Sequence, residues 1–148
     1  MRKIKYRALG TKGWKPTEGK GWFYGTNDKS EYIGFISQAD AKPQHTSLLM
    51  FERNIQGRYL DENTRCEFSG FYDKTGKEVF ERDIIKHRAF EMCVFVCVFE
   101  QGRFQFREYD KTLGMGEVWG MNADEVAWCC DIIGDEIHNK DLLAVVGG

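Results

Sequence analysis

The sequence lacks the features that mark several large classes of protein. No apolar run approaches the ~20 residues that a membrane-spanning helix needs, and no apolar segment of signal-peptide length follows the basic N-terminus. No two cysteines form a C-x-x-C pair, although zinc sites usually draw their four ligands from two such pairs. We therefore expect a cytosolic protein with buried, reduced thiols and with no bound metal or cofactor. The cysteines are Cys66, Cys93, Cys97, Cys129 and Cys130.

Proline is rare, and long amphipathic helical patterns are absent. The 148 residues include two prolines but 16 glycines, and aromatic residues make up 14% of the chain. Glycine and aromatic residues in these amounts favour short strands joined by tight turns. We predict a mainly β protein with minor helical additions. It would consist of an N-terminal β-hairpin module (residues 1–46) and a larger β domain (residues 47–148), folded separately or around one shared core.

Charge is unevenly distributed, although the net charge is only −2. Residues 1–50 carry 9 Lys/Arg against 4 Asp/Glu, whereas residues 51–148 carry 12 against 19. The basic N-terminal part could attract the acidic remainder of the chain or an acidic partner. Its lysines are scattered rather than clustered, which favours ordinary solvated faces over a nucleic-acid surface.

Short apolar stretches bounded by glycine or polar residues predict the strands. They lie at residues 3–9, 21–25, 31–37, 47–53, 66–71, 79–87 and 129–134. The clearest feature is a hairpin over residues 91–109, with a two-residue turn at Gln101-Gly102. Its seven consecutive apolar residues, 93–99, predict a strand that is covered on both faces. We further expect a loop at residues 112–122, a helical turn at 123–128 and a short helix at 139–145 capped by Asn139.

The segment at residues 66–86 contains an Asp-Lys-Thr-Gly sequence that a ligand-binding loop could use. A phosphate loop of the Walker type would need glycine in place of Phe71 and a hydroxyl residue in place of Glu78. A calcium loop would need another oxygen ligand in place of Lys77. We therefore predict a structural turn, in which Asp73 caps the turn backbone and Gly76 takes a left-handed conformation.

This segment resembles the hallmark of the YopX-like family of bacteriophage and prophage proteins, where a G-x-x-D-x-x-G-x-x-I/V-Y/F run leads to E-G-D-I-V. The matching positions are Gly70, Asp73, Gly76, Lys77, Glu78, Val79, Phe80, Glu81, Asp83, Ile84 and Ile85. Residues 1–8, 22–25 and 131–143 are similar to the opening, W-x-Y-G and closing segments of the family. The resemblance implies an N-terminal β-hairpin region followed by a small SH3-like barrel, located in the cytoplasm of a bacterial host. It brings no catalytic residues.

Arg82 departs from the hallmark, because it stands where the family has the glycine of E-G-D. A positive φ costs a non-glycine residue ~1 kcal/mol or more. We therefore predict an ordinary β or α backbone at Arg82, with a solvent-facing side chain and the bend displaced elsewhere.

Three functions are compatible with these patterns. The leading hypothesis is a non-catalytic module that binds a host or phage protein. The second is nucleic-acid binding through the N-terminal residues Arg2, Lys3, Lys5, Tyr6, Arg7, Trp22 and Tyr24. The third is a metal-dependent enzyme in which the carboxylates of Asp73, Glu78, Glu81 and Asp83 converge on a divalent cation. Strand edges that need covering also favour a homo-oligomer, and no membrane partner is expected.

Overall fold

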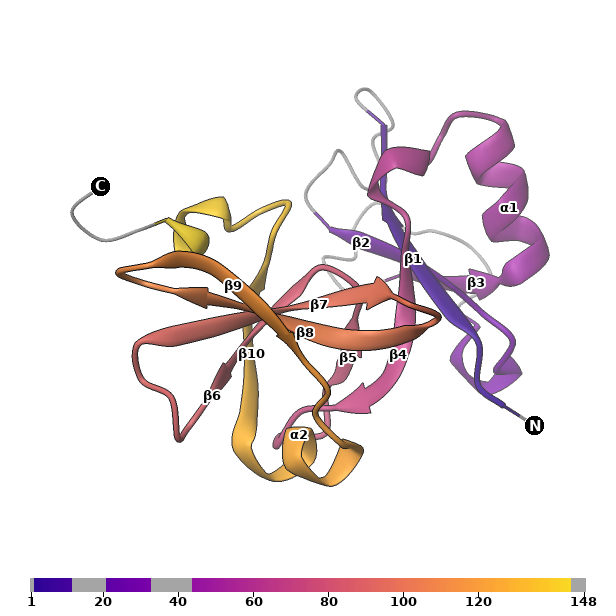
Figure 1. Ribbon diagram of the computed structural model, residues 1–148. Helices are drawn as coiled ribbons and strands as arrows, with labels where there is room; N and C mark the ends of the chain where they lie inside the picture. Colours follow the sequence, from indigo (N-terminus) through magenta and orange to yellow (C-terminus); the bar gives the residue numbers. More distant parts are fainter. Residues whose placement is uncertain (1, 12–20, 33–43, 145–148) are drawn as a thin grey trace. The chain divides into compact units, whose positions relative to one another are not determined.

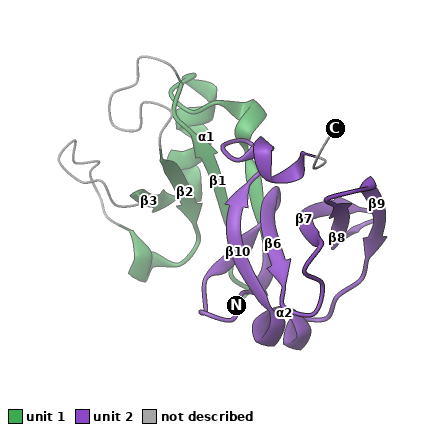
Figure 2. Ribbon diagram, turned by 90° about the vertical axis from the view of Figure 1, so that its left-hand side faces the viewer, with its two compact units in different colours: residues 1–68 green, residues 69–148 purple. Residues whose placement is uncertain are grey.

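The computed structural model describes residues 2–11, 21–32 and 44–144. The chain divides into two compact units, residues 1–68 and residues 69–148, coloured green and purple in Figure 2. Each unit is built on antiparallel strand pairs, so the prediction of a mainly β fold is confirmed. The strands form two five-stranded sheets, each with two edge strands in the part of the chain described.

The first unit is organised around three neighbouring strands. They are β1 (Lys5–Leu9), β2 (Trp22–Thr26) and β3 (Gln44–Ser47). β1 and β2 are antiparallel, whereas β2 and β3 are parallel. β4 (Cys66–Tyr72) pairs with the other side of β1 and continues into the second unit, where its neighbour is β5 (Glu78–Phe80). The strand predicted at residues 31–37 falls mostly outside the described residues.

Residues 48–56 form a helix, so the strand predicted at residues 47–53 is wrong. This helix, α1 (Leu48–Gln56), begins at Ser47, whose hydroxyl accepts a hydrogen bond from Met50 N–H. Its core-facing residues are spaced four apart: Phe51 is buried, and Ile55 packs against the same cluster. A short apolar run fits a strand or a helix equally well, and here the serine cap and the four-residue spacing decide. Two 3-10 turns, η1 (Lys29–Glu31) and η2 (Glu62–Thr64), complete the unit.

The first unit extends to Phe68, whereas the sequence placed a boundary between residues 46 and 47. The reason is that α1 and the chain after it complete the core of β1 and β2. The buried cluster combines Ala8 and Phe23 from the strands with Phe51 and Leu60 from beyond the expected boundary. Phe51 lies so close to Gly25 of β2 that a Cβ atom added to Gly25 would come within 2.5 Å of Cβ and Cγ of Phe51.

The second unit contains a five-stranded antiparallel sheet of order β10-β6-β7-β8-β9 (Figure 1). Its strands are β6 (Asp83–His87), β7 (Cys93–Glu100), β8 (Arg103–Asp110), β9 (Gly114–Trp119) and β10 (Cys130–Asp135). The predicted hairpin is confirmed: β7 pairs with β8 along its whole length, and both turn residues, Gln101 and Gly102, have positive φ. Such values are those of the hairpin turn that matches the natural twist of the strands.

β7 is covered on both faces from Cys93 to Cys97, as its apolar run predicted, whereas Phe99 near its end is 51% exposed. Phe95 and Cys97 belong to one buried cluster together with Phe106 of β8. Val94 and Val96 belong to a second cluster, against which residues of the 3-10 helix η3 (Lys140–Leu143) pack. Because successive strand residues point to opposite faces, both clusters draw on the same strand.

Two elements after β8 differ from expectation. The loop expected at residues 112–122 is partly the strand β9, whose glycines hide its alternation from the sequence pattern. The helix expected at residues 139–145 is only the 3-10 turn η3, and Asn139 does not cap it. Asn139 instead accepts a hydrogen bond from Asp135 N–H. The helical turn predicted at residues 123–128 is present as α2 (Ala123–Cys129), and the strand predicted at residues 129–134 is present as β10.

None of the helices in the described ranges has the length and apolar character that crossing a membrane requires.

Candidate functional site

The residues proposed for nucleic-acid binding do not form one exposed surface. Lys5 and Arg7 alternate with Tyr6 along β1, so they lie on the opposite face of the sheet from it. The Tyr6 ring stacks on Phe51 of α1, at 6.3 Å between ring centroids. Arg2 is exposed and precedes the first strand.

The other face of β1 and β2 pairs cations with aromatic rings. The Arg7 guanidinium lies 4.0 Å from the centre of the Trp22 ring, and Lys5 Nζ lies 5.8 Å from that of Tyr24. Lys5 and Arg7 are nevertheless only 1% and 4% exposed. Lys5 and Lys3 both form ion pairs with Glu31 of η1. These cations therefore act inside the protein, where buried charges require such partners.

In the hallmark turn, the Asp73 carboxylate accepts hydrogen bonds from backbone N–H groups. Oδ1 accepts hydrogen bonds from the N–H groups of Thr75 and Lys77, at 2.9 Å each, and from the Thr75 hydroxyl at 2.7 Å. Oδ2 accepts from Ile132 N–H of β10 at 3.1 Å. Asp73 is 4% exposed, and Gly76 has a φ of +83°, which only glycine adopts readily.

Burial and hydrogen bonding act on the Asp73 carboxyl in opposite directions. Burial opposes its ionisation, but hydrogen bonds from the Thr75 hydroxyl and from backbone N–H groups hold its pKa below the ordinary value of 3.8. All of these donors come from the protein itself. Asp73 therefore stabilises the turn and holds it against β10.

The remaining hallmark residues surround the second bend of the segment. Asp83 is buried, and its Oδ2 accepts from Phe80 N–H at 2.8 Å across the turn between β5 and β6. Phe80 is buried, Glu78 and Glu81 are half-buried, Lys77 is exposed, and Gly70 has a φ of +87° within β4. The carboxylates of residues 73–83 do not come together as a group of possible metal ligands.

Arg82 has a φ of +74°, so the prediction of an ordinary backbone there is wrong. The bend stays at the hallmark position because the backbone on both sides is fixed. Arg82 N–H donates to Cys97 C=O at 2.8 Å, and Arg82 C=O accepts from Glu136 N–H at 2.9 Å. β7 and the residue that follows β10 thus impose a conformation that arginine itself disfavours.

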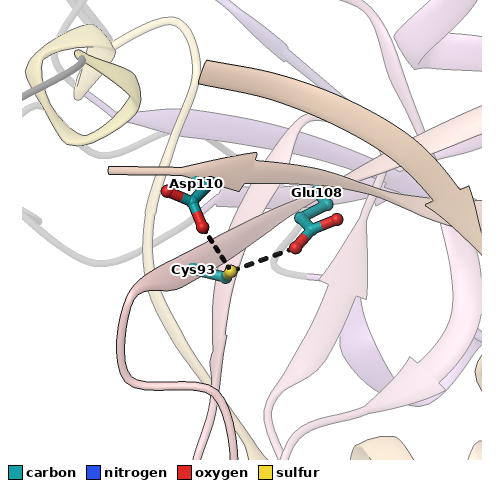
Figure 3. Close-up of side chains that lie close together, drawn as sticks. All are labelled: Cys93, Glu108 and Asp110. Carbon is teal, nitrogen blue, oxygen red and sulfur yellow. Dashed lines mark hydrogen bonds between the residues drawn. The ribbon is translucent and has the colours of Figure 1, made fainter. Parts of the chain in front are cut away.

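A thiol and two carboxylates meet at the far end of the β7–β8 hairpin (Figure 3). Cys93 Sγ lies 3.1 Å from Glu108 Oε1 and 3.6 Å from Asp110 Oδ2. The three possible ligand atoms all lie within 4.8 Å of one another, and no other such trio occurs in the described ranges. Cys93 is 8% exposed, whereas both carboxylates are half-buried.

The β7–β8 register explains why these side chains share one face. Cys93 stands opposite Asp110, and Phe95 stands opposite Glu108. Directly opposed residues point to the same side of a sheet, and so do residues two apart on one strand. Glu108 also needs the space left by Gly116 of β9, where a Cβ atom would come within 2.9 Å of Glu108 Oε2.

The Cys93 thiol and the Asp110 carboxyl have pKa values that are shifted in opposite directions. Burial, together with hydrogen bonds and the charges of Glu108 and Asp110, raises the pKa of the Cys93 thiol to about 12. Hydrogen bonds from the Thr112 hydroxyl and from the N–H groups of Thr112 and Leu113 lower the pKa of Asp110 to about 2. A protonated thiol therefore donates toward an ionised aspartate.

The sequence pattern did not lead us to predict this cluster, although it contains a signal for it. The predicted turn at Gln101-Gly102 already fixes the pairing, since a two-residue loop places Cys93 opposite Asp110. Cysteine spacing alone suggested no metal site because two of the three possible ligands are carboxylates.

The strand next to this cluster, β9, is an edge of the sheet and carries exposed apolar side chains. Leu113, in the turn before it, is 86% exposed, and Met115 within it is 66% exposed. Met92 is also exposed and lies at the same end of the sheet, because its C=O accepts from Lys111 N–H at 2.9 Å. In the part of the chain described, the backbone of β9 forms hydrogen bonds to other backbone groups only with β8.

The histidines that the structure describes are paired with carboxylates. His87 Nε2 lies 3.1 Å from Glu125 Oε2, and its Nδ1 accepts from Ala89 N–H. His138 Nδ1 lies 2.9 Å from Asp135 Oδ2. All five cysteines are free thiols.

Comparison with protein families identifies a match that covers most of this chain. The family described as YopX protein matches residues 5–144, which is nearly the whole sequence. A search of curated proteins found no match. The chain therefore belongs to the YopX family, as the hallmark segment indicated.

Proposed function

We propose that this member of the YopX family is a phage- or prophage-encoded accessory protein that binds a host or phage protein without catalysing a reaction. It acts in the cytoplasm of the bacterial host. Its partner presents an extended, apolar segment that adds to the sheet along β9. In this proposal the second unit corresponds to the SH3-like module that the family resemblance implies, and β9 is the edge at which the partner binds.

The observation that carries this proposal is an open strand edge beside exposed apolar side chains. Unpaired N–H and C=O groups along an edge strand are a template for another strand, and proteins usually protect such edges with charges. Here the edge carries a single charged residue, Glu117, beside the exposed Met115, and Leu113 precedes it. Strand addition would satisfy the backbone groups, while the apolar side chains would provide specificity.

The chemistry of the exposed residues suits a protein partner. Methionine has a flexible, polarisable side chain that adapts to different apolar surfaces, and Met92 and Met115 both lie at this end of the sheet. Burial of apolar surface contributes ~25 cal/mol per Å², so a few such side chains supply a useful part of a binding energy. Glu117 of β9 is exposed as well, which favours a partner that offers a cation beside the apolar residues.

The hallmark carboxylates support a role without catalysis. Both oxygens of Asp73 and Oδ2 of Asp83 accept hydrogen bonds from backbone N–H groups, which is a structural use of these carboxylates. The buried positions of Lys5 and Arg7 likewise favour a protein partner over nucleic acid, since phosphate contacts need accessible cations.

Capture from a host lysate, with matched variants, tests the proposal. The bait is the full chain, and the test variant is Leu113→Ser combined with Met115→Ser. Leu49→Ser, which removes an exposed leucine from α1 in the first unit, is the control. We expect specific proteins to be retained by the wild type and the control but to be reduced at least tenfold with the test variant, which corresponds to a loss of ~1.4 kcal/mol or more.

A peptide experiment then distinguishes strand addition from other modes of binding. Overlapping peptides of the captured protein are titrated against the full chain, and the best one is remade with alternate N-methylated amides. Loss of affinity on methylation supports strand addition. Unchanged affinity, or captured material that is removed by nuclease, contradicts it.

The same edge can pair with a second copy of the chain, which would give the homo-oligomer that the sequence favours. Light scattering during size exclusion measures this directly. A dimer that the Leu113→Ser, Met115→Ser variant converts to a monomer would assign β9 to self-association, and it would overturn the proposal of a different partner.

A further inference from the structure

The end of the β7–β8 hairpin holds three side chains in the geometry of a metal site. In tetrahedral zinc sites the metal lies ~2.3 Å from sulfur and ~2.0 Å from carboxylate oxygen, which separates two such ligands by ~3.5 Å. Cys93 Sγ lies 3.1 Å from Glu108 Oε1 and 3.6 Å from Asp110 Oδ2, on either side of that value. Both sulfur–oxygen distances are therefore close to those of ligands that share one ion, and all three ligand atoms lie within 4.8 Å of one another.

The backbone holds these side chains where they are. Cys93 and Asp110 are directly opposed in the β7–β8 ladder, and Glu108 is two residues from Asp110 on the same face. Oδ1 of Asp110 accepts from the N–H groups of Thr112 and Leu113, so its Oδ2 is turned toward Cys93. Gly116 leaves the space that the Glu108 carboxylate occupies.

The charge of the cluster also calls for a cation. Two carboxylates lie beside one thiol, and no lysine, arginine or histidine in the described ranges forms an ion pair with Glu108 or Asp110. The nearest arginine in the sequence, Arg107, is engaged by both oxygens of Glu100, at 2.7 and 2.8 Å. Mutual repulsion of two nearby carboxylates is relieved when a divalent cation lies between them.

We propose that Cys93, Glu108 and Asp110 bind one thiophilic divalent cation of the zinc class, with solvent in the fourth position. On binding, the thiol proton passes to solvent and a sulfur–metal bond forms, with no change in oxidation state. The sulfur ligand disfavours magnesium and calcium, which prefer oxygen ligands. The bound ion joins the start of β7 to the end of β8, next to the turn that leads into β9. This inference does not depend on the proposed protein partner.

Titration of tag-free, reduced full-length protein tests the site. Zn²⁺ binding is measured by calorimetry, and Cd²⁺ binding by the ultraviolet absorption of the cadmium–thiolate bond. We expect one ion per chain, and loss of the absorption band in Cys93→Ser. Cys129→Ser, which removes a half-buried thiol outside the cluster, is the matched control and should bind as the wild type does.

The carboxylates are tested with Glu108→Gln and Asp110→Asn, which keep the size of each side chain. Even indirect supports of metal ligands cost 10- to 100-fold in affinity when removed, so each of these variants should weaken binding at least ~10-fold. Circular dichroism checks that each variant is folded, and Glu108→Gln remains informative should Cys93→Ser fail to fold. The proposal is overturned if neither ion binds at millimolar concentration, or if Glu108→Gln and Asp110→Asn bind as tightly as the wild type. It is also overturned if Cys129→Ser abolishes binding.

Discussion

Two turns of the second unit share the sequence Asp-Lys-Thr, and their aspartates are used differently. Asp73 and Asp110 each open such a turn, and in each case Oδ1 accepts hydrogen bonds from the backbone N–H and the hydroxyl of the threonine two residues on. The second oxygen separates the two turns. Oδ2 of Asp73 accepts from Ile132 N–H, whereas Oδ2 of Asp110 faces Cys93 Sγ.

Local sequence determines what the two turns share, and tertiary structure determines how they differ. The Asp-Lys-Thr sequence sets the same turn twice, because the aspartate reaches its own backbone two residues on. The neighbouring strand then decides the use of the remaining oxygen. Beside β10 that oxygen supports the fold, and beside β7 it is offered to a thiol and to a bound cation. The hallmark turn of the family therefore has a structural role. Ligands are expected instead at the end of the sheet where β8 leads into β9.

The largest expected effect comes from Asp73→Asn. With Oδ1 kept in place, the amide presents an N–H group to Ile132 N–H, so a buried donor loses its acceptor. Leaving a buried group unsatisfied costs 1–3 kcal/mol, and we expect the free energy of unfolding to fall by ~2 kcal/mol or more in urea titrations. Asp110→Asn is the matched control, and its unfolding midpoint should stay close to that of the wild type. Equal losses in the two variants would contradict the distinction between the turns.

Acid should weaken the same contacts. The pKa of Asp73 is lowered in the folded protein, so its stabilisation is fully present above 3.8, the ordinary value, and is lost as pH falls through the lower folded pKa. We therefore expect the difference in unfolding free energy between wild type and Asp73→Asn to be constant near neutral pH and to shrink below pH 3.8. Urea titrations of both proteins over this range measure it, and a difference that grows in acid would rule out the assignment.

A smaller effect of opposite sign is expected at Arg82, in the turn between β5 and β6. Arg82→Gly removes a positive φ from a non-glycine residue and loses an exposed pair with Glu136, whose Oε1 lies 3.6 Å from Arg82 Nε. The relief is ~1 kcal/mol and the exposed pair contributes less, so the variant should be more stable in thermal and urea unfolding. Arg103→Gly, in the extended backbone of β8, is the control and should lose stability. A destabilised Arg82→Gly would mean that the arginine side chain outweighs the strain.

The smallest effect should be the same in both turns. Thr75→Val and Thr112→Val each remove one hydroxyl that donates to Oδ1 of the turn aspartate. Each backbone N–H bond remains, so we expect a loss of at most ~1 kcal/mol for Thr75→Val and a change of the same sign for Thr112→Val. Thermal unfolding of the pair measures this, and opposite signs would show that the two turns differ locally as well.

The sequence allowed prediction of those features that depend on local pattern. The β7–β8 hairpin, its turn at Gln101-Gly102 and the hallmark turn follow from alternation and turn chemistry. The helix α1 and the strand β9 do not, because a short apolar run fits two structures and glycines mask alternation. The conformation of Arg82 depends on Cys97 and Glu136, which only the fold brings near. The thiol–carboxylate cluster could be predicted from the sequence only by combining the hairpin register with the side-chain types on both strands.

Hydrogen exchange with and without zinc tests most directly the claim that one Asp-Lys-Thr turn is structural and the other faces a ligand. The N–H groups of Thr112 and Leu113 are bonded to Asp110, and those of Thr75 and Lys77 to Asp73. On addition of Zn²⁺ to the full chain, we predict exchange at Thr112 and Leu113 to slow at least ~10-fold, the equivalent of ~1.4 kcal/mol, with no change at Thr75 and Lys77. No slowing at Thr112 and Leu113, or equal slowing in both turns, would contradict the claim.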